Sequence, residues 1–138
     1  MSEKRLWDYI RGGIGHAGHF DRIESTFTVA GRPDVNYCID GCEGDFELKI
    51  YDKRKGGFVL RSGQVAWHAK RVQAKGRCFI IARYDGPKKL FLLIHSKNAK
   101  HLAHDRSFEG WLAQSALVWE GSINWSKLKA TLKGVKDE

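Results

Sequence analysis

Long apolar stretches are missing from this chain of 138 residues. No run approaches the roughly 20 consecutive apolar residues that a membrane-spanning helix needs, and the first residues do not follow the pattern of a secretory signal peptide. The three cysteines, Cys38, Cys42 and Cys78, are an odd number at no familiar metal-binding spacing. We therefore expect a reduced protein in the cytoplasm, with no membrane contact and no disulfide scaffold.

Acidic residues are outnumbered, because 24 Lys and Arg face 16 Asp and Glu, which gives a formal charge of +8 at pH 7. Basic proteins of this size often bind polyanions, and nucleic acid is the commonest of these. The charge alone does not separate a nucleic-acid protein from a ribosomal, membrane-surface or merely soluble one. Repeats and low-complexity linkers are also missing, so residues 1–138 are expected to form one domain.

Hydrophobic periodicity predicts alternating helices and strands. Ser2 is expected to cap a first helix that runs to about Ile10, where the glycine-rich segment 12–18 breaks it. The other predicted elements are three strands at Ile23–Val29, Val35–Ile39 and Asp45–Tyr51, a helix that Ser62 caps and Gly76 ends, and two strands at Cys78–Arg83 and Leu90–His95. A turn at Asp40-Gly41 is predicted between the second and third strands.

The resulting order, α-β-β-β-α-β-β-α, indicates the α/β class with a mixed central β-sheet flanked by helices. The helix between two apolar strands predicts a βαβ crossover. The core is expected at about residues 22–95, and about 96–138 is expected to be a helical extension made of helices and loops.

The third predicted strand alternates strictly between apolar and polar residues. Its two faces carry Phe46, Leu48 and Ile50 on one side and Asp45, Glu47, Lys49 and Tyr51 on the other. Glu47 and Lys49 therefore project from one face, about 7 Å apart along the strand. Asp34, at the start of the preceding strand, is predicted to lie opposite Glu47.

Two carboxylates and a lysine in this arrangement suit the hydrolysis of a phosphodiester. Carboxylates such as Asp34 and Glu47 hold a divalent cation, which activates water, and the Leu48 carbonyl can reach the same cation. Lys49 would orient the water and neutralise the charge that develops on phosphorus. The alternatives are a cross-strand ion pair on an exposed strand for Glu47 and Lys49, and a turn residue for Asp34.

Pro33-Asp34, followed by Glu47-Leu48-Lys49 on the next strand, resembles the signature of the PD-(D/E)XK nuclease superfamily. The fuller stretch resembles its virus-type replication-repair nuclease (VRR-NUC) branch, through Gly31-Arg32-Pro33-Asp34, Gly44-Asp45-Phe46-Glu47-Leu48-Lys49, Ser62-Gly63-Gln64-Val65-Ala66-Trp67 and Gly76. The resemblance covers about residues 22–95. It implies a restriction-endonuclease-like domain in which Asp34, Glu47 and the Leu48 carbonyl hold one or two Mg²⁺ or Mn²⁺ ions, and in which Lys49 and Gln64 complete the catalytic set.

The resemblance also implies a substrate and a setting. Stand-alone members of this branch are similar to Holliday-junction resolvases of phage, which act as homodimers in the bacterial cytoplasm. They need no organic cofactor, and their products carry a 5′-phosphate and a 3′-hydroxyl. A non-selective DNA nickase or nuclease, and a nucleic-acid-binding module that has lost catalysis, remain alternative functions.

Two groups of supporting residues complete the predicted site, the first from the same resemblance and the second from their position beside the catalytic strand. The family places a further metal-binding glutamate on the first helix, where Glu3 is one candidate and Glu24, on the next strand, is its rival. The expected DNA contacts are Lys53, Arg54 and Lys55 after the catalytic strand, and His68, Arg71 and Lys75 on the polar stripe below Gln64. A solvated helix face explains the second set equally well.

Overall fold

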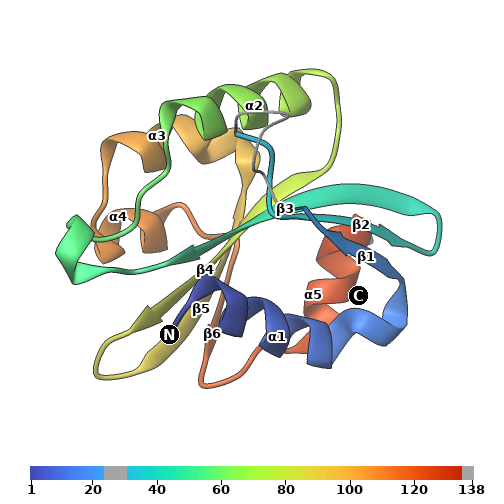
Figure 1. Cartoon of the computed structure of the whole chain (residues 1–138), viewed down its shortest axis with the longest axis horizontal. Helices are drawn as coiled ribbons and strands as arrows, with labels where there is room; N and C mark the ends of the chain where they lie inside the picture. The colour runs from blue at the N-terminus through green and yellow to red at the C-terminus, as the bar shows by residue number, and fades with distance from the viewer. Residues whose placement is uncertain (24–30, 135–138) are drawn as a thin grey trace.

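The structure is a computed structural model that describes residues 1–23 and 31–134 (Figure 1). The helices in this part of the chain are α1 (Glu3–Ile14), α2 (Ser62–Gln73), α3 (Ala99–His104), α4 (Phe108–Ala113) and α5 (Trp125–Lys133), with the 3₁₀ turns η1 (Gly15–Ala17), η2 (Lys53–Lys55) and η3 (Ser96–Asn98). The strands are β1 (His19–Arg22), β2 (Val35–Ile39), β3 (Cys42–Ile50), β4 (Cys78–Asp85), β5 (Lys89–His95) and β6 (Leu117–Glu120).

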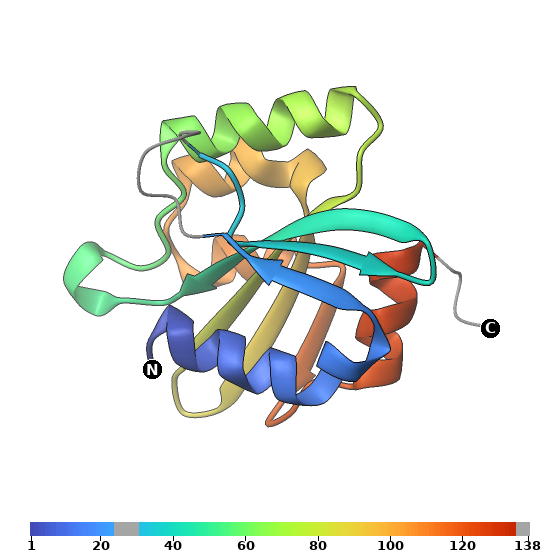
Figure 2. The same ribbon diagram turned by 45° about the vertical axis from the view of Figure 1, so that its right-hand side comes forward.

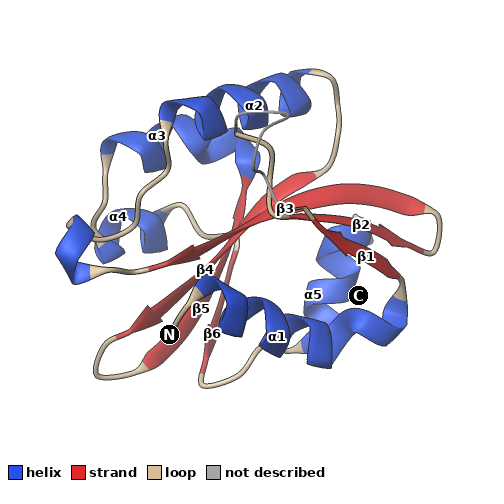
Figure 3. Cartoon of the chain, viewed as in Figure 1, coloured by secondary structure: helices blue, strands red, loops and turns tan. Residues whose placement is uncertain are grey.

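The six strands form one mixed sheet in the order β1-β2-β3-β4-β5-β6. Neighbouring strands are antiparallel, except that β3 and β4 run parallel and are joined through α2. The predicted βαβ crossover is therefore confirmed, and the protein is of the mixed α/β kind. Helices cover both faces, with α2, α3 and α4 on one side and α1 and α5 on the other (Figures 1 and 3).

Each face of the sheet has its own hydrophobic core. Phe46 and Leu48 of β3 pack with apolar residues of α1 and α5 on one face. On the other face, Ile80 of β4 and Trp111 of α4 belong to a second cluster. Because side chains alternate along a strand, the polar residues of β3 share the face that α2 covers.

Helix α1 begins where the sequence predicts and ends later. The Ser2 hydroxyl accepts a hydrogen bond from the Arg5 backbone N–H at 3.1 Å, as expected of an N-cap. The predicted break after Ile10 is wrong, because the helix continues to Ile14, a residue that is 1% exposed in the core. Gly13 lies directly against the Trp125 ring of α5, so a glycine inside this helix allows the two helices to approach closely.

The two glycines of α1 should respond in opposite directions to alanine. Gly12→Ala adds a methyl group where no atom lies within 4 Å, so it should stabilise the fold by about 1 kcal/mol through helix propensity. Gly13→Ala places a methyl group inside the volume of the Trp125 ring, and it should destabilise the fold by about 1–3 kcal/mol. Urea unfolding of both variants measures the contrast. Equal shifts would contradict the described packing of α1 on α5.

Two edge strands differ from the sequence prediction. The strand predicted at Ile23–Val29 lies, from residue 24 onward, outside the described residues, and β1 instead occupies His19–Arg22. The segment predicted to hold only helices and loops contributes β6, which pairs antiparallel with β5. Leu128 and Leu132 of α5 also belong to the core cluster that contains residues of α1, and α5 lies beside the end of α1 (Figure 2).

Within residues 1–23 and 31–134, no helix combines the length and the apolar character that crossing a membrane would require.

Candidate active site

Asp34 lies against β3 at the point where the β2–β3 pairing stops. The last pair is Val35 with Phe46, so Asp34 lies opposite Glu47, as predicted. The Leu48 backbone N–H donates a hydrogen bond of 2.8 Å to Asp34 Oδ2. Since the N–H and C=O of one strand residue point to the same side, the Leu48 carbonyl faces the edge that Asp34 occupies.

Glu47 is a buried carboxylate with one oxygen satisfied. Glu47 is only 2% exposed, and its Oε1 accepts a hydrogen bond of 2.9 Å from Gln64 Nε2. Its Oε2 is buried and has no hydrogen-bond partner within the described residues. Burial, and then the nearby negative charge of Asp34, raise the pKa of Glu47 well above the ordinary carboxyl value, against the opposing charge of Lys49.

Gln64, in the first turn of α2, connects Glu47 and Lys49 of the candidate site. Lys49 Nζ donates a hydrogen bond of 2.9 Å to Gln64 Oε1 and lies 3.9 Å from Glu47 Oε1. The Arg61 backbone N–H donates to the same Gln64 oxygen at 3.0 Å. Arg61, rather than the predicted Ser62, is therefore the N-cap residue of α2, and the capping acceptor is the Gln64 amide. One side chain thus fixes both Glu47 and Lys49 relative to the helix.

The buried setting of Glu47 and Lys49 removes one alternative. A cross-strand ion pair on a solvent-exposed strand does not describe side chains that are 3% and 10% exposed. Both lie under α2, on the polar face of β3. Burying two charged groups has a large desolvation cost, and groups with perturbed pKa values gather at functional sites.

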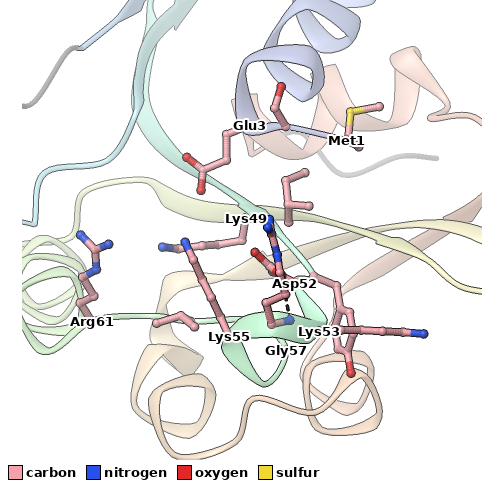
Figure 4. A pocket seen from close by; sticks show the side chains of 13 residues that line it. Met1, Glu3, Lys49, Asp52, Lys53, Lys55, Gly57 and Arg61 are labelled. Atoms are coloured by element: carbon pink, nitrogen blue, oxygen red, sulfur yellow. Dashed lines mark hydrogen bonds and ion pairs between the residues drawn. The ribbon is translucent and has the colours of Figure 1, made fainter.

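Glu3 lies across a hollow from Lys49 (Figure 4). Partial burial raises the pKa of Glu3, the negative charge of Asp34 raises it further, and the positive charges of Lys49 and Lys55 oppose the increase. The first helix therefore carries an acidic group toward the site. Its rival, Glu24, lies outside the described residues.

The metal-free protein should become less stable as pH rises, because Glu47 holds a proton in the folded state. Between the ordinary carboxyl pKa, about 4.3, and its raised value in the fold, the native state holds a proton that the unfolded state releases. Stability relative to Glu47→Gln should then fall by up to about 1.4 kcal/mol per pH unit. Urea unfolding of both proteins in EDTA from pH 5 to pH 8 measures this difference. A constant difference would show that Glu47 ionises normally.

The oxygen atoms of the site suit a divalent cation bound by few protein ligands. No three His, Cys, Asp or Glu side chains gather into a metal-holding cluster in residues 1–23 and 31–134. Mg²⁺ is usually bound by one or two protein carboxylates, together with waters and substrate phosphates. The unpartnered Oε2 of Glu47, the adjacent Asp34 carboxylate and the Leu48 carbonyl edge fit that requirement.

The predicted basic contacts divide into two groups. Lys53, Arg54 and Lys55 form the exposed turn η2, and they line a pocket of about 680 Å³ that also includes Lys49. Arg61 lines the same pocket. Arg61 was not among the residues predicted for the site, although its position three residues before Gln64 could have indicated it.

The predicted DNA contact at His68 is wrong. The residue is fully buried, with Nδ1 2.6 Å from Ser96 Oγ and 3.3 Å from Cys78 Sγ. His68 is one turn below Gln64, and this stripe of α2 faces the sheet instead of solvent. Arg71 is exposed and lies 4.5 Å over the Trp67 ring, and Lys75 follows the helix end with a φ of 68°.

No protein-family model matches the chain, and a search of curated proteins finds no match.

Proposed function

We propose that this protein is a metal-dependent DNA endonuclease whose active site consists of Asp34, Glu47, Lys49 and Gln64. One observation carries the proposal. The buried carboxylate of Glu47 has an unpartnered oxygen beside Asp34, and Gln64 joins it to the ammonium group of Lys49. A structural role alone gives no reason to bury the Glu47 carboxyl group and the Lys49 ammonium group together, beside a half-buried Asp34.

Each residue of the site has a distinct part in this proposal. Asp34 and Glu47 would hold Mg²⁺ or Mn²⁺, with the Leu48 carbonyl beside them. Such a cation, when bound, lowers the pKa of water and stabilises charge on a phosphate. Lys49 places an ammonium group next to the carboxylates, where it can orient the attacking water and neutralise developing negative charge. Gln64 keeps Lys49 and Glu47 at a fixed separation.

The proposal includes a restriction-endonuclease-like fold. A mixed sheet whose parallel pair, β3 and β4, is joined by α2 supports it. The position of Asp34 at the start of β2 and of Glu47 within β3 supports it as well. The sequence resemblance to VRR-NUC nucleases points in the same direction.

The proposed substrate is branched DNA, cut by a homodimer. This part rests on the sequence resemblance and on the charge of +8. A basic domain can gain affinity from backbone phosphates and DNA shape, so binding should weaken steeply with salt. Two copies would be needed to cut opposed strands symmetrically.

A cleavage panel tests the proposal. The wild-type protein is incubated with a labelled four-way junction, linear duplex and single strand, each with Mg²⁺. We expect paired cuts in the junction and little cutting of the linear forms. Equal cutting of all three DNA forms would support a nuclease but contradict the proposed preference for junctions. Binding to DNA with no cutting, in Mg²⁺ and Mn²⁺ alike, would overturn the proposed activity.

A further inference from the structure

The pocket beside Lys49 gathers positive charge that the catalytic residues do not require. It lies between η2 and the first residues of α1, and its volume is about 680 Å³. Figure 4 shows Lys55 directed toward Lys49 and Glu3, while Lys53, on the same turn, points away from them. Arg61 stands on the other side of Lys49. The charges of Lys49 and Lys55 both act on Glu3, which agrees with this arrangement.

The turn that carries Lys55 is held in place from three directions. The Asp52 side chain accepts a hydrogen bond of 2.9 Å from the Arg54 backbone N–H. The backbones of Asp52 and Gly57 form two hydrogen bonds, of 3.1 and 2.9 Å, that close the turn. Arg106 Nη1, from the segment between α3 and α4, donates to the Lys55 carbonyl at 2.9 Å. Lys55 therefore starts from a fixed backbone position.

Arg61 is also tied to the site through its backbone. Its N–H donates to the Gln64 oxygen that also accepts from Lys49. The backbone of Arg61 is therefore held beside the same Gln64 amide that binds Lys49. Lys55, Lys49 and Arg61 together present three cations around one hollow, with Glu3 on the opposite wall.

We propose that Lys55 and Arg61 form a second phosphate subsite, which binds a phosphate of the substrate strand next to the phosphate that is cut. This inference rests on the proposed function for its substrate class. Converging cations in a fixed pocket match a phosphate, which accepts charge-assisted hydrogen bonds from arginine and lysine. The group held could be an internal phosphodiester or a terminal phosphate of the strand.

Binding measurements in EDTA test the subsite without requiring cleavage. The DNA is a set of labelled four-way junctions, in which the branch point fixes where the protein binds, each with one linkage near the branch replaced by a neutral methylphosphonate, and a further pair with and without a 5′-phosphate. For the wild type, we expect one neutral linkage, or loss of the terminal phosphate, to weaken binding about three- to tenfold. The first result would identify an internal phosphate and the second a terminal one.

The variants decide whether that phosphate contacts these residues. In Lys55→Ala and Arg61→Ala the same replacement should have little further effect, since the contact is already lost. Lys100→Ala, on the exposed surface of α3 and outside the pocket, should keep the wild-type sensitivity. The subsite is overturned if both pocket variants remain as sensitive as the wild type, or if no single phosphate matters. Because no cleavage is needed, failure of the nuclease activity would be seen separately, in the substrate panel.

Discussion

Mg²⁺-dependent DNA cleavage by Glu47→Gln is expected to be at least about 1,000-fold slower than by the wild type. Glutamine keeps the size of the side chain and can still accept from Gln64, so the fold should be retained. The change replaces Oε2, the buried oxygen without a partner, by an amide nitrogen that cannot bind a cation. Initial rates on labelled duplex or junction DNA measure the effect.

A carboxylate elsewhere on the same strand provides the matched control. Glu43 is exposed on β3, at the end away from the site, so Glu43→Gln should cleave at the wild-type rate. If Glu47→Gln is folded and retains more than about a tenth of the wild-type rate, the residue is not the cation-binding carboxylate that the proposal requires.

Replacement of Lys49 by methionine is expected to lower the cleavage rate by about 10²–10⁴-fold while DNA binding changes little. Methionine fills a similar volume, so the buried position under α2 should stay packed. It removes the ammonium group that lies 2.9 Å from Gln64 and 3.9 Å from Glu47. The loss should therefore appear in the rate constant at saturating DNA.

Lys100→Met on α3 is the control for this second change, because Lys100 is exposed and lies outside the pocket. A Lys49→Met protein that cleaves normally at saturating DNA, but binds DNA more weakly, would contradict the catalytic role. Lys49 would then be a phosphate contact like those proposed for Lys55 and Arg61.

Sequence patterns located the catalytic strand because its physical signals are local. Strict alternation placed Glu47 and Lys49 on one face, and the structure agrees. The turn at Asp40 and Gly41 was also predictable, since both residues adopt positive φ values, of 50° and 81°, that Asp and Gly tolerate best. Pairing of the two strands across that turn then placed Asp34 opposite Glu47.

The orientation of α2 could not be read in the same way. Few apolar residues mark an inward stripe on this helix, so periodicity does not indicate which polar stripe faces the sheet. His68 and Gln64 lie on the inward stripe because the face of β3 below them is itself polar. A buried polar face departs from the hydrophobic pattern on which sequence interpretation depends, and such departures are expected at functional sites.

The two edge strands, β1 and β6, were not predicted for a different reason. β1 and β6 have four residues each, and β1 is mostly exposed, so neither shows the sustained alternation that marks a half-buried strand. Their pairing depends on β2 and β5, which are distant in sequence. The close approach of Gly13 to Trp125 is equally non-local, and it explains why α1 continues through its glycines.

The most direct test of the central claim is a cleavage time course with wild-type protein and end-labelled DNA, in Mg²⁺ and in EDTA, with the product ends identified. We predict strand cuts only in Mg²⁺, leaving a 5′-phosphate and a 3′-hydroxyl. DNA that is bound but never cut, in Mg²⁺ and in Mn²⁺, would contradict the claim and leave a basic DNA-binding protein in which Glu47 is buried beside Asp34.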